Sequence, residues 1–154
     1  MSEVLHFCRR FVEFVEREGV AGDAELRELQ WITLRLSASA AHRAPSASTP
    51  VEDERPIASA TRTRAEIAAR FPRFGWHRSV LDRLIAAEPR MDAGDAIDDI
   101  EDIYNDAREA LEVLDAHGEE EAEEHFQLLF RAHTGARAHD LAAYLHDLRT
   151  RSAS

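Results

Sequence analysis

The chain has 154 residues, 44% of them hydrophobic, which is enough for one folded domain spanning residues 1–154. Its 30 acidic and 19 basic residues give a formal net charge of -11, which disfavours nucleic-acid and anionic-membrane binding because both depend on excess cationic side chains. All basic residues are arginines and Cys8 is the single cysteine, so a Schiff-base lysine, an internal disulfide and a thiolate metal cluster are excluded.

The chain opens with apolar residues at helical spacing. They predict a first amphipathic helix that Ser2 caps and that Gly19 and Gly22 end. Its stripe is Val4, Cys8, Phe11 and Val15. These first residues lack the apolar core and cleavage site of a secretory signal, and no apolar run approaches the roughly 20 residues that cross a bilayer. We therefore expect a soluble, cytoplasmic protein.

A second helix is predicted to begin at Asp23 as its N-cap and to pack antiparallel on the first across a short link. Its apolar stripe is Leu26, Leu29, Ile32 and Leu36. The pattern stops at residues 41–60, which contain three prolines, three serines and no apolar periodicity. Prolines preclude a continuous helix, so this stretch is predicted to be a mobile, disordered loop within the domain.

Two short helices are predicted in the middle of the chain. Thr63 and Glu66 have the spacing of a capping box, and the helix that they start is expected to stop before Pro72. An aromatic, turn-prone stretch follows at residues 71–76. Pro89 is then expected to end a second short helix, which carries the apolar residues Val80, Leu81, Leu84 and Ile85.

The last third of the chain is predicted to form two longer helices. The first runs from Asp95 to His117 and ends at Gly118, and the second runs from Glu119 to Arg149. Gly135 interrupts the second one, so a kink or a close helix contact is expected there. Residues 150–154 are expected to be a frayed tail. No stretch has the alternation of a strand, so the predicted fold is an all-α bundle of five or six helices.

The negative charge is concentrated in one segment. Residues 92–125 contain 15 acidic residues and a single arginine, Arg108, whereas the rest of the chain is nearly neutral. At about 100° per residue, six of these carboxylates fall within one sector of the predicted helix. They are Asp95, Asp98, Asp99, Asp102, Asp106 and Glu109. This face is the predicted binding site for a basic protein partner, and a solvated or arginine-paired face is the alternative.

The Asp-rich segment also allows a site other than a protein-binding face. A divalent metal is the alternative ligand, held by Asp99, Asp102, Asp106 and His133. His133 lies four residues after Leu129, so a hydrogen-bonded core histidine is the competing interpretation. Tyr104, beside the apolar stripe, is expected to bury its phenol against His133 or an arginine. No catalytic site and no cofactor is predicted, because the sequence contains no complete catalytic set.

Several residues also carry a family resemblance. Phe74-Gly75-Trp76, then Glu88-Pro89, then the helix from Asp98 to Asp106 resemble a bacterial domain family of unknown function with an Asp-Asp-x-x-Asp-Ile-Tyr-x-Asp helix. Phe130, His133 and Gly135 match the last helix of that family, but Thr134 replaces its tryptophan and Arg137 its following histidine. The match covers mainly residues 71–150. It implies a compact all-helical domain and no activity, and it singles out Asp98, Asp99, Asp102, Tyr104, Asp106 and His133.

Three functional hypotheses follow from the sequence. The first is a non-enzymatic interaction module, of the immunity, antitoxin or regulatory kind, that presents an acidic face to a basic protein. The second is a metal-binding helical protein, such as a hydrolase, that uses the Asp-rich helix. The third is a scaffold or homo-oligomer, because long apolar helices can also pair between chains.

Overall fold

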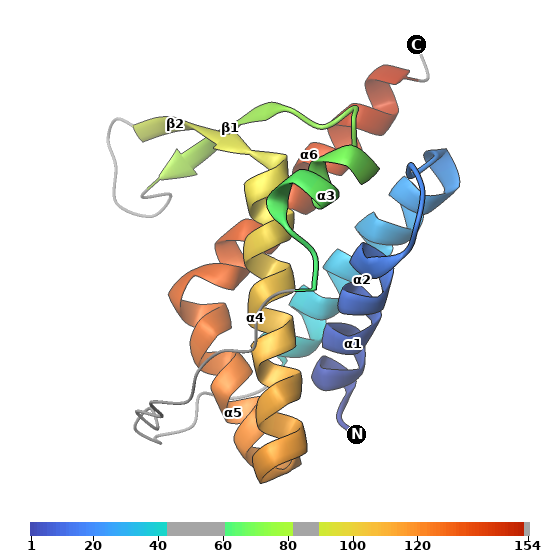
Figure 1. The fold of residues 1–154 in the computed structure, drawn as a ribbon. Coiled ribbons are helices and arrows are strands. Elements are labelled where there is room, and N and C mark those ends of the chain that lie inside the picture. The colour runs from blue at the N-terminus through green and yellow to red at the C-terminus, as the bar shows by residue number, and fades with distance from the viewer. Residues whose placement is uncertain (43–60, 82–89, 153–154) are drawn as a thin grey trace.

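The computed structural model describes residues 1–42, 61–81 and 90–152, and within the two strands it describes the side chains of residues 76–78 and 93–95. Helices dominate these residues, so the predicted all-α fold class is confirmed (Figure 1). The loop predicted at residues 41–60 lies, from residue 43 onward, outside the described residues. No helix in the described part of the chain is long and apolar enough to cross a membrane.

Helices α1, Glu3–Glu16, and α2, Asp23–Ala41, lie side by side and run in opposite directions (Figure 1). The hydroxyl of Ser2 caps α1 by accepting a hydrogen bond from the amide of Leu5 at 3.5 Å. The N-cap of α2 is Gly22, not Asp23 as predicted, and its amide donates to the Glu25 carboxylate at 3.1 Å. Both predicted stripes are buried.

Helix α3, Arg64–Arg70, begins at the predicted capping box, in which Thr63 and Glu66 each bond the other's backbone amide. Its last residue, Arg70, is buried between the rings of Phe14 and Phe71. The Arg70 guanidinium donates to the carbonyl of Gly19 at 2.8 Å. This arginine therefore ties α3 to the link between α1 and α2.

An antiparallel hairpin replaces one predicted helix. Strand β1, Trp76–Leu81, pairs with β2, Arg90–Asp95, and places His77 opposite Gly94. Residues 80 and 81 are therefore in a strand, and the prediction of a helix there was wrong; residues 82–89 lie outside the described part. A short apolar run does not distinguish strand from helix by its periodicity, and here the pairing with β2 decides. The hairpin projects from the end of the bundle where α4 begins (Figure 1).

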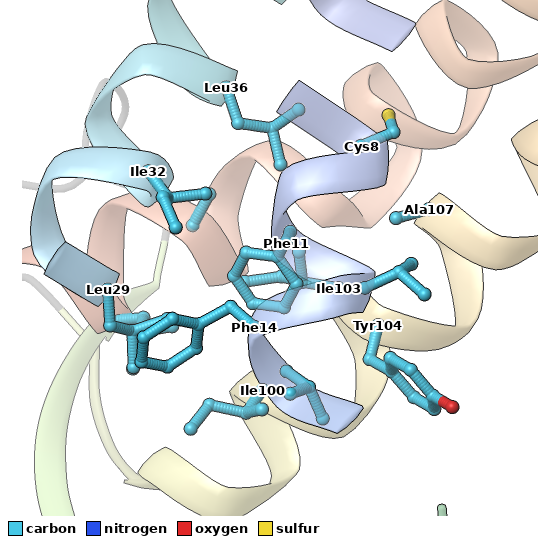
Figure 2. Packing of buried hydrophobic residues seen from close by; sticks show 14 of the residues in the cluster. Cys8, Phe11, Phe14, Leu29, Ile32, Leu36, Ile100, Ile103, Tyr104 and Ala107 are labelled. Carbon is cyan, nitrogen blue, oxygen red and sulfur yellow. The ribbon is translucent and has the colours of Figure 1, made fainter. Parts of the chain in front are cut away.

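Helix α4, Ala96–His117, lies at the centre of the bundle (Figure 1). The Asp95 carboxylate caps it by accepting from the amide of Ile97 at 2.9 Å. Figure 2 shows how Ile100 and Ile103 of α4 meet Phe11 and Phe14 of α1, with Leu29, Ile32 and Leu36 of α2 beside them, and all these side chains are fully buried. The core thus lies where α1, α2 and α4 meet, and it includes buried residues of α3, α5 and α6 as well.

The rest of the chain is one long helix with a π-turn in it. Helix α5, Glu119–Leu129, continues through the π-turn η1, Phe130–Thr134, into α6, Gly135–Ser152. The interruption expected at Gly135 is this π-turn, in which the Gly135 amide donates to the carbonyl of Phe130. Helix α6 extends to Ser152, so residues 150–152, which were expected to be frayed, are helical; residues 153 and 154 lie outside the described residues.

The spacing of buried residues explains the π-turn. One row of them recurs every fourth position along this helix, at Ala122, Phe126, Thr134, Ala138 and Ala142, with half-buried Phe130 between. An α-helix has 3.6 residues per turn, so each four-residue step turns the buried side by about 40°. A π-turn contains one more residue than an α-turn and compensates for part of this rotation.

A charged seam between α4 and its neighbours

An arginine of α3 pairs with carboxylates at the start of α4. The Arg64 guanidinium donates to the Asp95 carboxylate at 2.6 Å and also bonds Asp98, and it lies 3.6 Å from Glu101. Two of the six carboxylates predicted to bind a partner therefore share one intramolecular arginine.

Asp99, one turn farther, is fully buried and lies between the hairpin and α6. Its Oδ2 is 2.6 Å from Nε2 of His77, and its Oδ1 is 3.3 Å from Nη1 of Arg137. The same arginine reaches Asp102 through Nε at 3.1 Å. Burial raises the pKa of the Asp99 carboxyl, because a buried carboxylate loses its hydration, and His77 and Arg137 offset part of this rise.

Asp106 is buried against the π-turn. Its Oδ2 accepts a hydrogen bond from the Thr134 hydroxyl and lies 3.2 Å from Nδ1 of His133. Burial raises the pKa of Asp106, and the bond from Thr134 and the nearby imidazole of His133 partly offset this effect. The next acid, Glu109, is 2.7 Å from Nε2 of His125 on α5.

These contacts form an internal structure, which we call the α4 seam. Its carboxylates are Asp99, Asp102, Asp106 and Glu109 of α4, and its partners are His77, His125, His133, Thr134 and Arg137. All six predicted carboxylates thus have partners within the molecule, as the arginine-paired alternative expected. They do not form a free acidic surface.

The predicted metal ligands are not gathered around one point. Asp99 and Asp102 share Arg137, whereas His133 lies beside Asp106. Among the described residues, no group of three or more histidine, cysteine, aspartate or glutamate side chains could hold a metal ion. A guanidinium already occupies the position between the first two carboxylates.

His133 is not a core histidine, because half of its side chain is exposed. The prediction extended the α5 periodicity through residue 133, but the π-turn changes the phase of the helix. Thr134 occupies the buried position instead.

Tyr104 is buried as predicted, but with different partners. Its hydroxyl bonds Thr61 at 2.6 Å and Glu16 at 2.9 Å, and the Arg108 guanidinium lies 5.8 Å from the centre of its ring. Of the two expected partners, an arginine is present, because Arg108 packs against the ring, whereas the hydroxyl bonds Thr61 and Glu16.

Sequence reasoning missed four partners of the seam: His77, His125, Thr134 and Arg137. One signal for His77 was available. In the hairpin its ring lies over Gly94, where any Cβ would come within 2.8 Å of Nε2. A glycine opposite a histidine therefore marks the place where the ring lies flat against the neighbouring strand.

The remaining acidic residues form a different surface where α4 meets α5. Between Arg108 and Arg131, 22 residues contain eight carboxylates and no arginine. Four of these acids are exposed at the junction, and we call them the acidic corner: Asp115, Glu119, Glu120 and Glu121. The Met1 ammonium lies 3.3 Å from Glu119. Within the described ranges, no ion pair joins Asp115, Glu120 or Glu121 to a basic group.

Comparison of the chain with protein-family models, curated proteins and solved structures gave no significant match. The resemblance carried by the Asp-rich helix therefore stays a prediction.

Proposed function

We propose that the protein is a cytoplasmic interaction module, regulatory or of the immunity or antitoxin kind, that binds a basic protein through the acidic corner. The observation that carries this proposal is the contrast between the two acidic regions. The carboxylates of the α4 seam are paired inside the molecule, whereas three of the four in the acidic corner have no intramolecular cation among the described residues. Unpaired, exposed charges of one sign attract an oppositely charged partner and speed its association.

The acidic corner also has a well-packed base. Ala122 and Phe126 of α5 are fully buried beneath it, and Gly118, with φ of 101°, makes the tight connection from α4. Only glycine adopts this backbone conformation without strain. The backbone that carries these carboxylates is therefore fixed before a partner arrives, which lowers the entropic cost of binding.

The test is affinity capture with two charge-matched baits. One carries Asp115→Asn, Glu120→Gln and Glu121→Gln in the acidic corner. The control carries Glu13→Gln, Glu18→Gln and Asp147→Asn, three exposed carboxylates on other parts of the surface. At low ionic strength we expect wild type and control to retain the same basic protein and the corner variant to lose it.

Salt supplies a second criterion. Raising ionic strength from about 0.05 M to about 0.5 M shortens the Debye length several-fold and should release the partner from wild type. A partner that the corner variant still retains, or that high salt does not release, would contradict the proposal.

A further inference from the structure

Two neighbouring residues of the π-turn reach the same oxygen atom. The Thr134 hydroxyl donates to Oδ2 of Asp106, and Nδ1 of His133 lies 3.2 Å from that oxygen. Thr134 is fully buried, whereas half of the His133 side chain is exposed. Consecutive residues of an α-helix point about 100° apart, so in a regular helix only one of the two would face α4.

The two halves of the long helix disagree about which residue that is. Counting forward from the buried residues Ala122 and Phe126 of α5, by eleven and by seven, places residue 133 on the packed side. Counting back from Ala138 and Leu141 of α6, by four and by seven, places residue 134 there. The halves are out of phase by one residue, and the π-turn accommodates this extra residue.

We propose that the π-turn moves between two positions along the helix and that Asp106 bonds a residue of the turn in each of them. In the position observed, at Phe130–Thr134, Thr134 bonds Asp106. When the extra residue moves about one turn toward α6, residues up to 134 follow the phase of α5, and His133 takes the place of Thr134. Helix α5 and the C-terminal part of α6 keep their packing, because each half keeps its own phase.

The movement would open the α4 seam. Arg137 lies within the stretch whose direction changes, and it is the guanidinium that bridges Asp99 and Asp102. If Arg137 moves away, His77 is the remaining partner of Asp99 among the contacts described above. Asp102, which is already half-exposed, can then bind an external cation. The position of the π-turn therefore determines whether Asp99 and Asp102 are paired with Arg137.

Gly135 permits the observed position. A Cβ there would lie 2.8 Å from the carbonyl oxygen of Phe130 and 3.1 Å from its ring. That carbonyl is also the acceptor for the Gly135 amide in the π-turn. In a regular α-turn the amide would bond residue 131 instead, and alanine is the most favourable residue for a helix.

Gly135→Ala and Thr134→Val should therefore both shift the π-turn, the first by crowding it and the second by removing the hydroxyl that bonds Asp106. Scalar couplings across hydrogen bonds, measured by NMR, report which carbonyl the amide of residue 135 bonds. We expect Phe130 in wild type and Arg131 in most molecules of both variants. Thr134→Ser keeps the hydroxyl and should behave like wild type. A coupling to Phe130 in both variants would overturn the proposal.

The wild-type protein gives an independent measurement, which holds even if a variant does not fold. Relaxation-dispersion NMR should show exchange on the microsecond-to-millisecond scale at residues 130–139 and not in α1 or α2. Flat dispersion profiles across the π-turn would equally overturn the proposal.

Discussion

Asp99 illustrates how a buried carboxylate is balanced at the residue scale. It has no exposed surface, it contacts a histidine and an arginine, and its pKa is still raised because the loss of hydration outweighs the effect of these partners. Glu28 shows the opposite balance. It is partly exposed, and its hydrogen bond from Arg17 holds its pKa below the ordinary value.

The two residues should therefore give opposite pH dependence. A carboxyl with a raised folded-state pKa binds a proton more readily in the folded state, so its stabilising contribution is full below the ordinary pKa of about 4 and is lost as pH rises through the folded value. The contribution of Glu28 is present above the ordinary glutamate pKa and is lost as pH falls.

Urea unfolding between about pH 3.5 and 6.5 tests this prediction. Asp99→Asn should gain stability relative to wild type as pH rises above about 4, because the variant has no carboxylate to desolvate. Glu28→Gln should lose stability relative to wild type over the same rise. If the stability of both variants relative to wild type changes in the same direction with pH, the pKa shifts of Asp99 and Glu28 have been assigned wrongly.

At the scale of elements, the hairpin depends on a small number of contacts with the bundle. The Gly75 amide donates to the Tyr144 hydroxyl at 2.9 Å, the Gly75 carbonyl accepts from Ala96, and His77 reaches Asp99. Two-stranded hairpins are marginally stable alone, so these contacts fix its position. The His77 contact requires the space above Gly94.

Gly94→Ala should consequently displace the His77 ring from Asp99. We expect it to lower the free energy of unfolding by about 1–3 kcal/mol, the usual cost of overpacking. Gly75→Ala is the matched control in the same hairpin, because a Cβ there meets nothing within 4 Å, and it should change stability by less than about 0.5 kcal/mol. Equal losses in the two variants would argue against a specific role for the His77 ring.

At the scale of the whole molecule, the formal charge of -11 is unevenly distributed. The carboxylates of the α4 seam have partners within the molecule, whereas three of the four in the acidic corner are joined to no basic group among the described residues. Like charges in contact repel, and salt screens that repulsion.

Salt should therefore stabilise the protein in the absence of any partner. The melting temperature should rise between about 0.05 M and 0.5 M sodium chloride. The corner variant used for affinity capture should melt higher than wild type at low salt and respond less to its addition. The charge-matched control changes the net charge equally but relieves less repulsion, so its response should stay close to that of wild type.

Much of this architecture could be predicted because its causes are local. The capping box of Thr63 and Glu66, the end of α4 at Gly118 and the buried stripe of α1 each depend on residues a few positions apart. The hairpin could not be predicted in this way, because β1 and β2 stabilise each other although residues 82–89 separate them in the sequence. The direction of the His133 side chain was predicted wrongly because the π-turn lets α5 and α6 both pack on the bundle. The periodicity within either helix does not reveal that turn.

The sequence by itself determined the helices and the concentration of carboxylates on one side of α4, since both follow from periodicity along a single element. Only the tertiary structure decided that the carboxylates of this side meet partners within the molecule. Their arginine and histidine partners come from α3, β1, α5, the π-turn and α6. Packing brings these segments to α4, and a carboxylate placed against an arginine or histidine in the interior no longer contributes a free charge to the surface.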